Sequence, residues 1–177
     1  GYNGFSYQDI STAMGIKNAA VHYYFPSKET LGTSILKTNS QRFDEMVENM
    51  QNRGFDEWHQ LEAFMKIYLK SSRDNKICII GSLGTDVNTL SEPMQQELQK
   101  MVERILAWLT ETLENGKQKG LFQFRIPASD QAIQILSSLV AGLQLARVLG
   151  KQAFKSIHQS IWEEITPSGA NSNSENS

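Results

Sequence analysis

Apolar residues recur along most of the chain at the three- and four-residue spacing of amphipathic helices. The segment 92–119 shows this most clearly, because its apolar stripe follows the period of a helix that packs on one face. The one run rich in β-forming residues is 77–80, and a lone short strand has no partner. The pattern therefore predicts an all-α fold. Long helices are expected over residues 28–51, 56–72, 92–119, 128–149 and 152–165.

Capping residues and breaks predict two further, short helices near the start of the chain. Ser6 and Asp9 form a capping-box pair at the start of the first helix, and Gly15 ends it. The second helix covers about 17–24 and ends before Pro26. Two short helices joined by a tight turn are what a helix-turn-helix requires.

The helix pattern predicts three parts of the chain. Residues 1–45 form a helix-turn-helix DNA-binding domain, residues 46–166 form a larger helical part, and residues 167–177 form a Ser/Asn-rich disordered tail. Within the second part, the segment 75–90 is irregular or weakly helical. The protein is thus expected to combine a small module with a larger helical bundle.

Composition and charge narrow the possible functions. The 177 residues carry a net charge of -2, so DNA binding must rest on local contacts and not on a global field. The single cysteine, Cys78, excludes an intrachain disulfide and agrees with a cytoplasmic location. No run of apolar residues appears long enough to span a bilayer. The histidines are scattered, and no metal-ligand, phosphate-loop or catalytic pattern is present, so we predict neither an enzyme nor a cofactor.

The predicted recognition helix carries the residues suited to DNA. Its small side chains, Ala19 and Ala20, let it sit deep in the major groove. The next helix begins at Ser27 and offers free backbone N–H groups to a phosphate. We predict DNA contacts from Lys17, Asn18, Ala19, His22, Tyr23, Tyr24 and Lys28.

Simpler roles exist for each of these side chains. The tyrosines, Tyr23 and Tyr24, can be core aromatics, whereas Lys17 and Lys28 can be ordinary surface lysines. His22, if buried, can be a core histidine with satisfied hydrogen bonds. Their exposure in the folded chain separates these alternatives.

The stretch 1–31 resembles the DNA-binding signature of the TetR/AcrR family of bacterial regulators. The resemblance is carried, in the family's order and spacing, by Gly1, Tyr2, Phe5, Ser6, Ile10, Ala13, Gly15, Tyr23, Phe25, Lys28 and Leu31. In the family plan a first helix, missing from this chain, precedes Gly1. Lys17 stands where a Ser-like cap is usual, and His22 and Tyr24 stand where Tyr and His are common. The resemblance implies that residues 46–166 are a ligand-binding and dimerisation domain. It also implies a homodimer in which the last two helices of each copy form a four-helix interface.

The resemblance also implies an effector cavity among the later helices. Met and aromatic linings suit an apolar or aromatic small molecule, although such stripes at helical spacing are more often plain core. Cys78 is either a buried structural residue or a redox or electrophile sensor. The expected lining residues are Phe64, Tyr68, Cys78, Met101, Ile105, Trp108, Leu139 and Leu143.

These observations predict a ligand-responsive transcriptional repressor that a small-molecule effector releases from double-stranded operator DNA. Effector binding is expected to move the long helix over 28–51, which links the two modules. The alternative is a helical dimeric protein-interaction module with an incomplete DNA-binding domain. A helical enzyme that uses Cys78 or a histidine is a third and weaker hypothesis.

Overall fold

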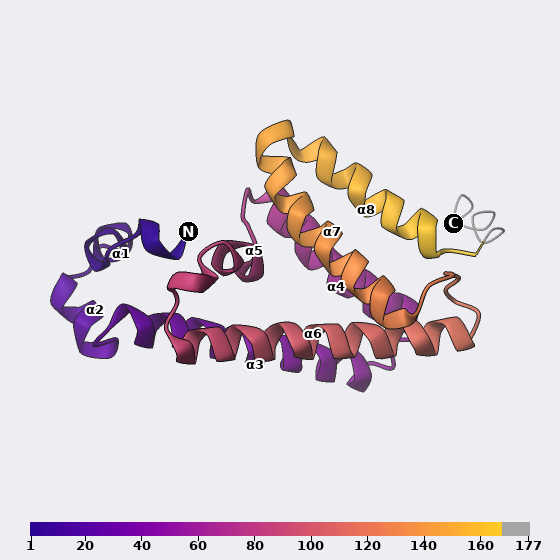
Figure 1. Cartoon of the computed structure of the whole chain (residues 1–177), viewed down its shortest axis with the longest axis horizontal. Coiled ribbons are helices and arrows are strands. Elements are labelled where there is room, and N and C mark those ends of the chain that lie inside the picture. Colours follow the sequence, from indigo (N-terminus) through magenta and orange to yellow (C-terminus); the bar gives the residue numbers. More distant parts are fainter. Residues whose placement is uncertain (168–177) are drawn as a thin grey trace. The chain divides into compact units, whose positions relative to one another are not determined.

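The computed structural model describes residues 1–167 and shows helices without any strand in that range (Figure 1). The all-α prediction is confirmed. The predicted tail lies outside the described residues, except for residue 167. The chain divides into two compact units: the first joins Gly1–Met46 to Ile79–Glu103, and the second joins Val47–Cys78 to Arg104–Ser177.

The first unit contains the two predicted short helices and an unexpected segment from later in the chain. Its elements are η1 (Tyr2–Gly4), α1 (Tyr7–Met14), α2 (Asn18–Tyr24), the first part of α3 (Lys28–Asn52), α5 (Ile79–Gly84), η2 (Val87–Thr89) and the first part of α6 (Glu92–Gln118). Asn3 connects the two sequence regions, because its side-chain amide donates to the Thr89 hydroxyl at 2.8 Å. Sequence periodicity does not reveal such a long-range contact.

Local capping explains why α1 and α2 begin and end where they do. The Ser6 hydroxyl accepts from the Asp9 backbone N–H, while the Asp9 carboxylate accepts from the Ser6 backbone N–H at 2.7 Å. Hydrogen bonds from Ser6 hold the pKa of Asp9 below its usual value. Gly15 ends α1 at φ +67°, a left-handed conformation that favours glycine. Lys17 precedes α2 without a side-chain cap, as its chemistry requires.

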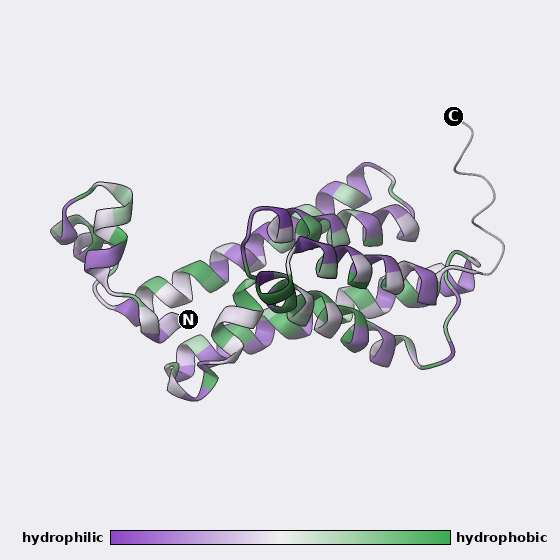
Figure 2. Ribbon diagram, turned by 90° about the horizontal axis from the view of Figure 1, so that it is seen from above, coloured by the Kyte–Doolittle hydropathy of each residue, from purple (hydrophilic) through white to green (hydrophobic). Residues whose placement is uncertain are grey.

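The second unit is built around α4 (Glu57–Arg73), α7 (Ala128–Leu149) and α8 (Lys151–Ile165), which pack against one another (Figure 1). Figure 2 shows hydrophobic and hydrophilic residues interspersed along the helices, as expected for helices that bury only one face. Gly150 joins α7 to α8 at φ +94°. A Cβ at Gly142 would lie 3.2 Å from Phe154 and Ile157, so this glycine serves close packing of α7 on α8 within one chain.

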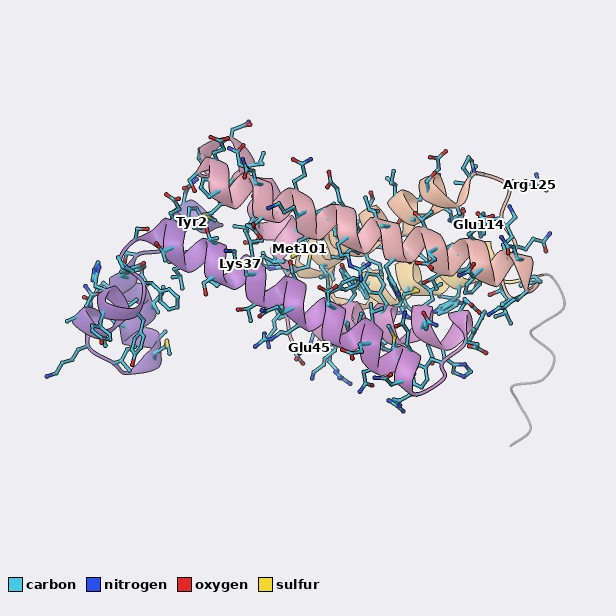
Figure 3. The ribbon with its side chains drawn as sticks, turned by 90° about the horizontal axis from the view of Figure 1, so that it is seen from below. Tyr2, Lys37, Glu45, Met101, Glu114 and Arg125 are labelled. Carbon is cyan, nitrogen blue, oxygen red and sulfur yellow. The ribbon has the colours of Figure 1, made fainter. Side chains whose placement is uncertain are left out.

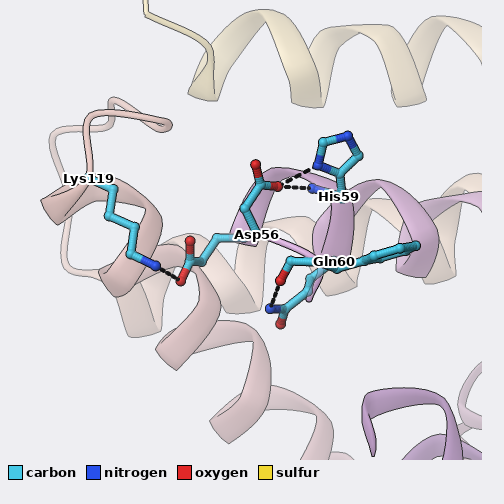
Figure 4. A network of polar contacts seen from close by, with 6 residues as sticks. Asp56, His59, Gln60 and Lys119 are labelled. Carbon is cyan, nitrogen blue, oxygen red and sulfur yellow. Dashed lines mark hydrogen bonds and ion pairs between the residues drawn. The ribbon is translucent and has the colours of Figure 1, made fainter. Parts of the chain in front are cut away.

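A polar network fixes the start of α4 (Figure 4). The Asp56 carboxylate accepts from the His59 backbone N–H at 2.9 Å and contacts the His59 ring nitrogen at 2.6 Å. Burial alone would raise the pKa of Asp56, but the hydrogen bonds from His59 outweigh it and lower the pKa. Lys119, just after α6, pairs with the nearly buried Glu57 at 2.7 Å. The network therefore ties the first turn of α4 to the end of α6.

One expectation about the chain's apolar segments is wrong. Helix α7 is 22 residues long with a mean hydropathy of 1.6 in its most apolar window, so by length and composition it is able to cross a membrane. The sequence pattern hid this because small polar residues interrupt the apolar run. In the structure α7 packs against α4 and α8, and 39% of that window is buried. Length and composition are weak indicators here, since core helices pass the same test.

Candidate nucleic-acid interface and binding cavities

Helix α2 presents two strongly exposed aromatic side chains. Tyr23 is 81% exposed and Tyr24 is 72% exposed, and their rings meet edge to face at 5.1 Å. Between these exposed positions and the start of the helix, Val21 is buried. The Tyr7 hydroxyl donates to the Phe25 carbonyl at 2.9 Å and so fixes the end of α2 against α1. The tyrosines are therefore not core residues, and a rigid support holds them at the surface.

The neighbouring side chains extend this exposed surface. Lys17 and Ala19 are exposed, whereas Asn18 is half-buried and its amide oxygen has no hydrogen-bond partner. His22 is exposed and its ring lies edge-on to Tyr7 at 4.6 Å, so it is not a core histidine. Five of the predicted DNA-contact residues, Lys17, Ala19, His22, Tyr23 and Tyr24, thus contribute to the exposed surface of α2 and its N-cap. We call it the α2 surface.

Lys28 lies in a different environment from the α2 surface. Its ammonium group donates to the Phe5 carbonyl at 2.6 Å and sits over the rings of Phe5 and Tyr2, at 4.1 and 4.8 Å from their centroids (Tyr2 is labelled in Figure 3). Lys28 therefore holds the N-terminal segment on the start of α3. The sequence predicted a phosphate contact for Lys28 and missed this internal role.

Apart from Cys78, the predicted effector-binding residues lie in packed interiors. Phe64 packs between Tyr68 and Trp108, with ring centroids 5.4 and 5.3 Å apart. Burial raises the pKa of Tyr68, and the charge of Cys78 adds to the shift. Cys78 itself is half-buried. Met101, Ile105, Leu139 and Leu143 are all buried, and Met101 falls within the range of the first unit.

An open groove of about 590 Å³ runs between α4 and α8 in the second unit. We call it the α4–α8 groove. It was not predicted, although Trp58 belongs to the apolar stripe of its helix. The sequence does carry one signal for this groove. Trp58 and Trp162 stand on two amphipathic helices, and each has acidic neighbours. The groove is lined by Trp58, Glu62, Lys66, Leu69, His158, Gln159, Trp162, Glu163, Thr166 and Pro167.

The groove combines aromatic faces with charged groups. The rings of Trp58 and Trp162 lie 4.3 Å apart. Glu62 pairs with Lys66 at 2.9 Å. His158 contributes a buried Nε2 atom that has no hydrogen-bond partner. Burial lowers the pKa of His158, and the neighbouring Glu62 carboxylate partly offsets that shift.

The remaining titratable clusters do not form a metal centre. Within the described residues 1–167, no group of His, Cys, Asp and Glu side chains is arranged to hold a metal ion. The main chemical features of the second unit are its three tryptophans and the titratable groups of the groove. The groove offers aromatic faces, two carboxylates, an ammonium group and an imidazole to a bound molecule.

Comparisons with known proteins agree with these features. Residues 1–33 match the model of bacterial regulatory proteins of the tetR family, and residues 58–159 match the tetracyclin repressor-like C-terminal domain. The HTH-type transcriptional repressor NemR of Escherichia coli (strain K12) is 23% identical over 149 residues, which cover 82% of this chain and 74% of NemR. The repressor DhaR of Mycobacterium sp. (strain GP1) is 21% identical over 121 residues, 68% of this chain and 61% of DhaR.

Solved structures show the same architecture. A TetR family regulator from Agrobacterium tumefaciens has a TM-score of 0.85 and 28% identity, with coverage of 94% of this chain and 89% of its own. A TetR regulator from Legionella pneumophila has a TM-score of 0.81 and 29% identity, with the same coverage of 94% and 89%. The chain belongs to the TetR family of DNA-binding transcriptional repressors and is not an enzyme.

Proposed function

We propose that this protein is a cytoplasmic homodimer that reads operator DNA with its α2 surface and releases that DNA when a small molecule binds the second unit. One observation carries the DNA-reading part of the proposal: Tyr23 and Tyr24 are 81% and 72% exposed on a firmly supported helix. Large aromatic side chains that stay in water on a rigid element mark a binding surface.

The α2 surface fits the chemistry of a duplex. The hydroxyls of Tyr23 and Tyr24 and the His22 ring donate hydrogen bonds to phosphate oxygens, while Lys17 adds a positive charge at the helix start. Ala19 leaves room for a close approach to base edges. Lys28 contributes through the N–H donors that Phe5 does not use, and it also holds the N-terminal segment in place. Because the whole chain has a charge of -2, binding depends on these local contacts.

Exposed apolar residues on α7 support the homodimer. Val148 is 82% exposed, and Leu149, Ile133 and Leu145 are 69%, 51% and 46% exposed. A second copy that covers these residues would remove apolar surface from water. Twofold pairing also places two α2 surfaces on two half-sites of a palindromic operator.

Release of DNA requires coupling between the two units, and two helices provide it. Helices α3 and α6 each run from the first unit into the second, since the units divide at residues 46/47 and 103/104. An effector that binds one position of these helices more tightly shifts their equilibrium, and with it the spacing of the two α2 surfaces. The buried aromatic cluster of Phe64, Tyr68 and Trp108 is the proposed effector contact within the second unit.

The function is tested by selecting duplexes from a random-sequence DNA pool with the purified protein. We expect enrichment of an inverted repeat and a dimer in sedimentation analysis. Enrichment of no sequence, together with binding that does not weaken as salt rises, would contradict DNA recognition. A dimer without any DNA affinity would favour the protein-interaction module instead.

A further inference from the structure

We propose that the α4–α8 groove binds a small aromatic ammonium compound, an organic cation with a flat apolar body. The groove is separate from the aromatic cluster around Phe64 and Trp108, which was the predicted effector contact. The inference concerns ligand binding by the protein alone and does not depend on release of DNA. Three features of the groove carry it: its aromatic faces, its charge balance and one unsatisfied nitrogen atom.

The aromatic faces suit both parts of such a ligand. Trp58 and Trp162 are half-buried and lie on opposite helices, with ring centroids 4.3 Å apart. Phe122 stacks behind Trp58 at 6.0 Å and keeps that indole in place. Indole is the best aromatic partner for a cation and also stacks on flat apolar rings. A rigid tryptophan pair at the edge of an open groove is therefore a suitable platform for an aromatic cation.

The charge balance of the groove favours a cation over an anion. Its lining holds two carboxylates, Glu62 and Glu163, against one ammonium group, Lys66. Lys66 is already paired with Glu62, and both side chains are well exposed, at 61% and 39%, so this pair is weak and can open for a ligand. Glu163 accepts only from Gln159, at 2.7 Å, among the hydrogen bonds described for it. An incoming ammonium group thus finds carboxylate oxygen without having to displace a strong ion pair.

The unsatisfied atom is Nε2 of His158, which is buried and has no hydrogen-bond partner in the described part of the chain. Leaving such an atom unpaired is unfavourable, so a ligand that donates to it gains more than an ordinary hydrogen bond. His158 stays neutral at neutral pH because burial disfavours its charged form, and with its proton on Nδ1 it accepts at Nε2. A protonated amine supplies the required N–H.

The size of the groove fits a ligand of this class. A volume of about 590 Å³ lies within the range of small-molecule sites in proteins. The site is open on one side, which allows a ligand to enter without unfolding of the packed interior. A flat two-ring amine therefore fits between the indoles and the carboxylates.

The test uses the full chain without DNA and three matched probes: 1-naphthylmethylammonium, neutral 1-naphthylmethanol and anionic 1-naphthylacetate. The protein has three tryptophans, so it gives three indole N–H signals in an NMR spectrum of the nitrogen-15-labelled chain. We expect the ammonium probe to shift the signals of Trp58 and Trp162 and to leave that of the buried Trp108 unchanged. The neutral alcohol should bind about tenfold more weakly, and the anion should not bind.

Charge-neutral variants make the test specific. Glu62→Gln and Glu163→Gln should each weaken binding of the ammonium probe about tenfold, and His158→Leu about fivefold. Glu114→Gln is the matched control, because Glu114 is an exposed carboxylate on α6 outside the groove (Figure 3) and its loss changes the net charge equally.

Three results would overturn the proposal. One is a shift of the Trp108 signal alone, which would place the ligand in the packed cluster. The second is equal affinity for the ammonium compound and the alcohol, and the third is no shift with the probe at about 10 mM, which is weaker than any useful site. None of these results bears on recognition of DNA, which the selection experiment tests separately.

Discussion

Aromatic side chains occupy opposite situations in the two units of this protein. Tyr23 on α2 is 81% exposed, whereas Tyr68 and Phe64 on α4 are 6% and 3% exposed. The same residue types therefore serve different ends. On α2 they are exposed, where we propose that they contact DNA, and on α4 they fill an interior whose close packing resists change.

The contrast has a structural origin. The position of α2 rests on short-range features: a capping box at Ser6, a left-handed turn at Gly15 and a hydrogen bond from Tyr7. The interior around Phe64 rests on contacts between distant segments, such as its packing on Trp108. Substitutions on α2 should therefore affect binding, and those around Phe64 should affect folding.

The contrast between α2 and α4 is tested most sharply by truncating one aromatic residue on each of these helices. Phe64→Ala removes a buried ring between Tyr68 and Trp108 and should lower the free energy of unfolding by about 3–5 kcal/mol. Tyr23→Ala should change it by less than about 0.5 kcal/mol, because the side chain is exposed. Urea denaturation measures both. Similar losses for the two variants would show that α2 is part of a core.

Close packing in the second unit predicts a smaller but distinct effect at Gly116. A Cβ there would overlap the ring of Phe122, which is only 2% exposed and so cannot move away easily. Gly116→Ala should destabilise the protein by about 1–3 kcal/mol. Gly84→Ala is the control, since nothing lies within 4 Å of its added Cβ. Thermal unfolding that ranks Gly84→Ala below Gly116→Ala in stability would contradict this packing.

The contribution of the N-terminal cap of α1 to stability is tested at Ser6. Ser6→Ala removes the hydroxyl that caps α1 and should cost about 1 kcal/mol. The effect arises because the Asp9 backbone N–H loses its acceptor. Ser160→Ala, in an exposed position on α8, should change stability by less than about 0.5 kcal/mol. Equal stability of the two variants would mean that the cap contributes nothing.

The smallest expected effect is the pH dependence of His158. Burial lowers its pKa below the usual value of 6.5, so the unfolded chain takes up a proton first as the pH falls. His158 therefore destabilises the folded state as the pH drops below about 6.5, while Glu62 on α4, across the groove, limits the loss. His158→Gln should flatten the fall in unfolding free energy between about pH 7.5 and pH 5.5. The assignment to His158 is wrong if the unfolding free energy of the wild type stays constant over this pH range while that of His158→Gln falls.

Much of the fold followed from local sequence signals. The helix ends at Ser6 and Gly15 were predicted from capping chemistry, and the structure confirms them. The exposure of Tyr23 and Tyr24 agreed with the pattern of the recognition helix. These features depend on residues a few positions apart, which is why one sequence is enough to predict them.

The local sequence pattern did not predict contacts between segments that are far apart along the chain. The contact of Asn3 with Thr89 groups the segment Ile79–Glu103 with the first unit, and nothing in the local sequence indicates it. The internal role of Lys28 depends on Phe5 and Tyr2, far from it along the chain. The α4–α8 groove likewise arises only when two helices meet. Periodicity shows which face of a helix is apolar but not which partner covers it.

The most direct test of the central claim compares wild type with the double variant Tyr23→Ala/Tyr24→Ala on the inverted repeat selected by the wild type. Fluorescence anisotropy gives the affinity for that duplex and for a scrambled one, and sedimentation reports the dimer. The account predicts that the double variant remains a folded dimer and loses about 2–3 kcal/mol of operator affinity, roughly 30- to 150-fold. A folded double variant that binds the operator as tightly as wild type would contradict the role of the α2 surface.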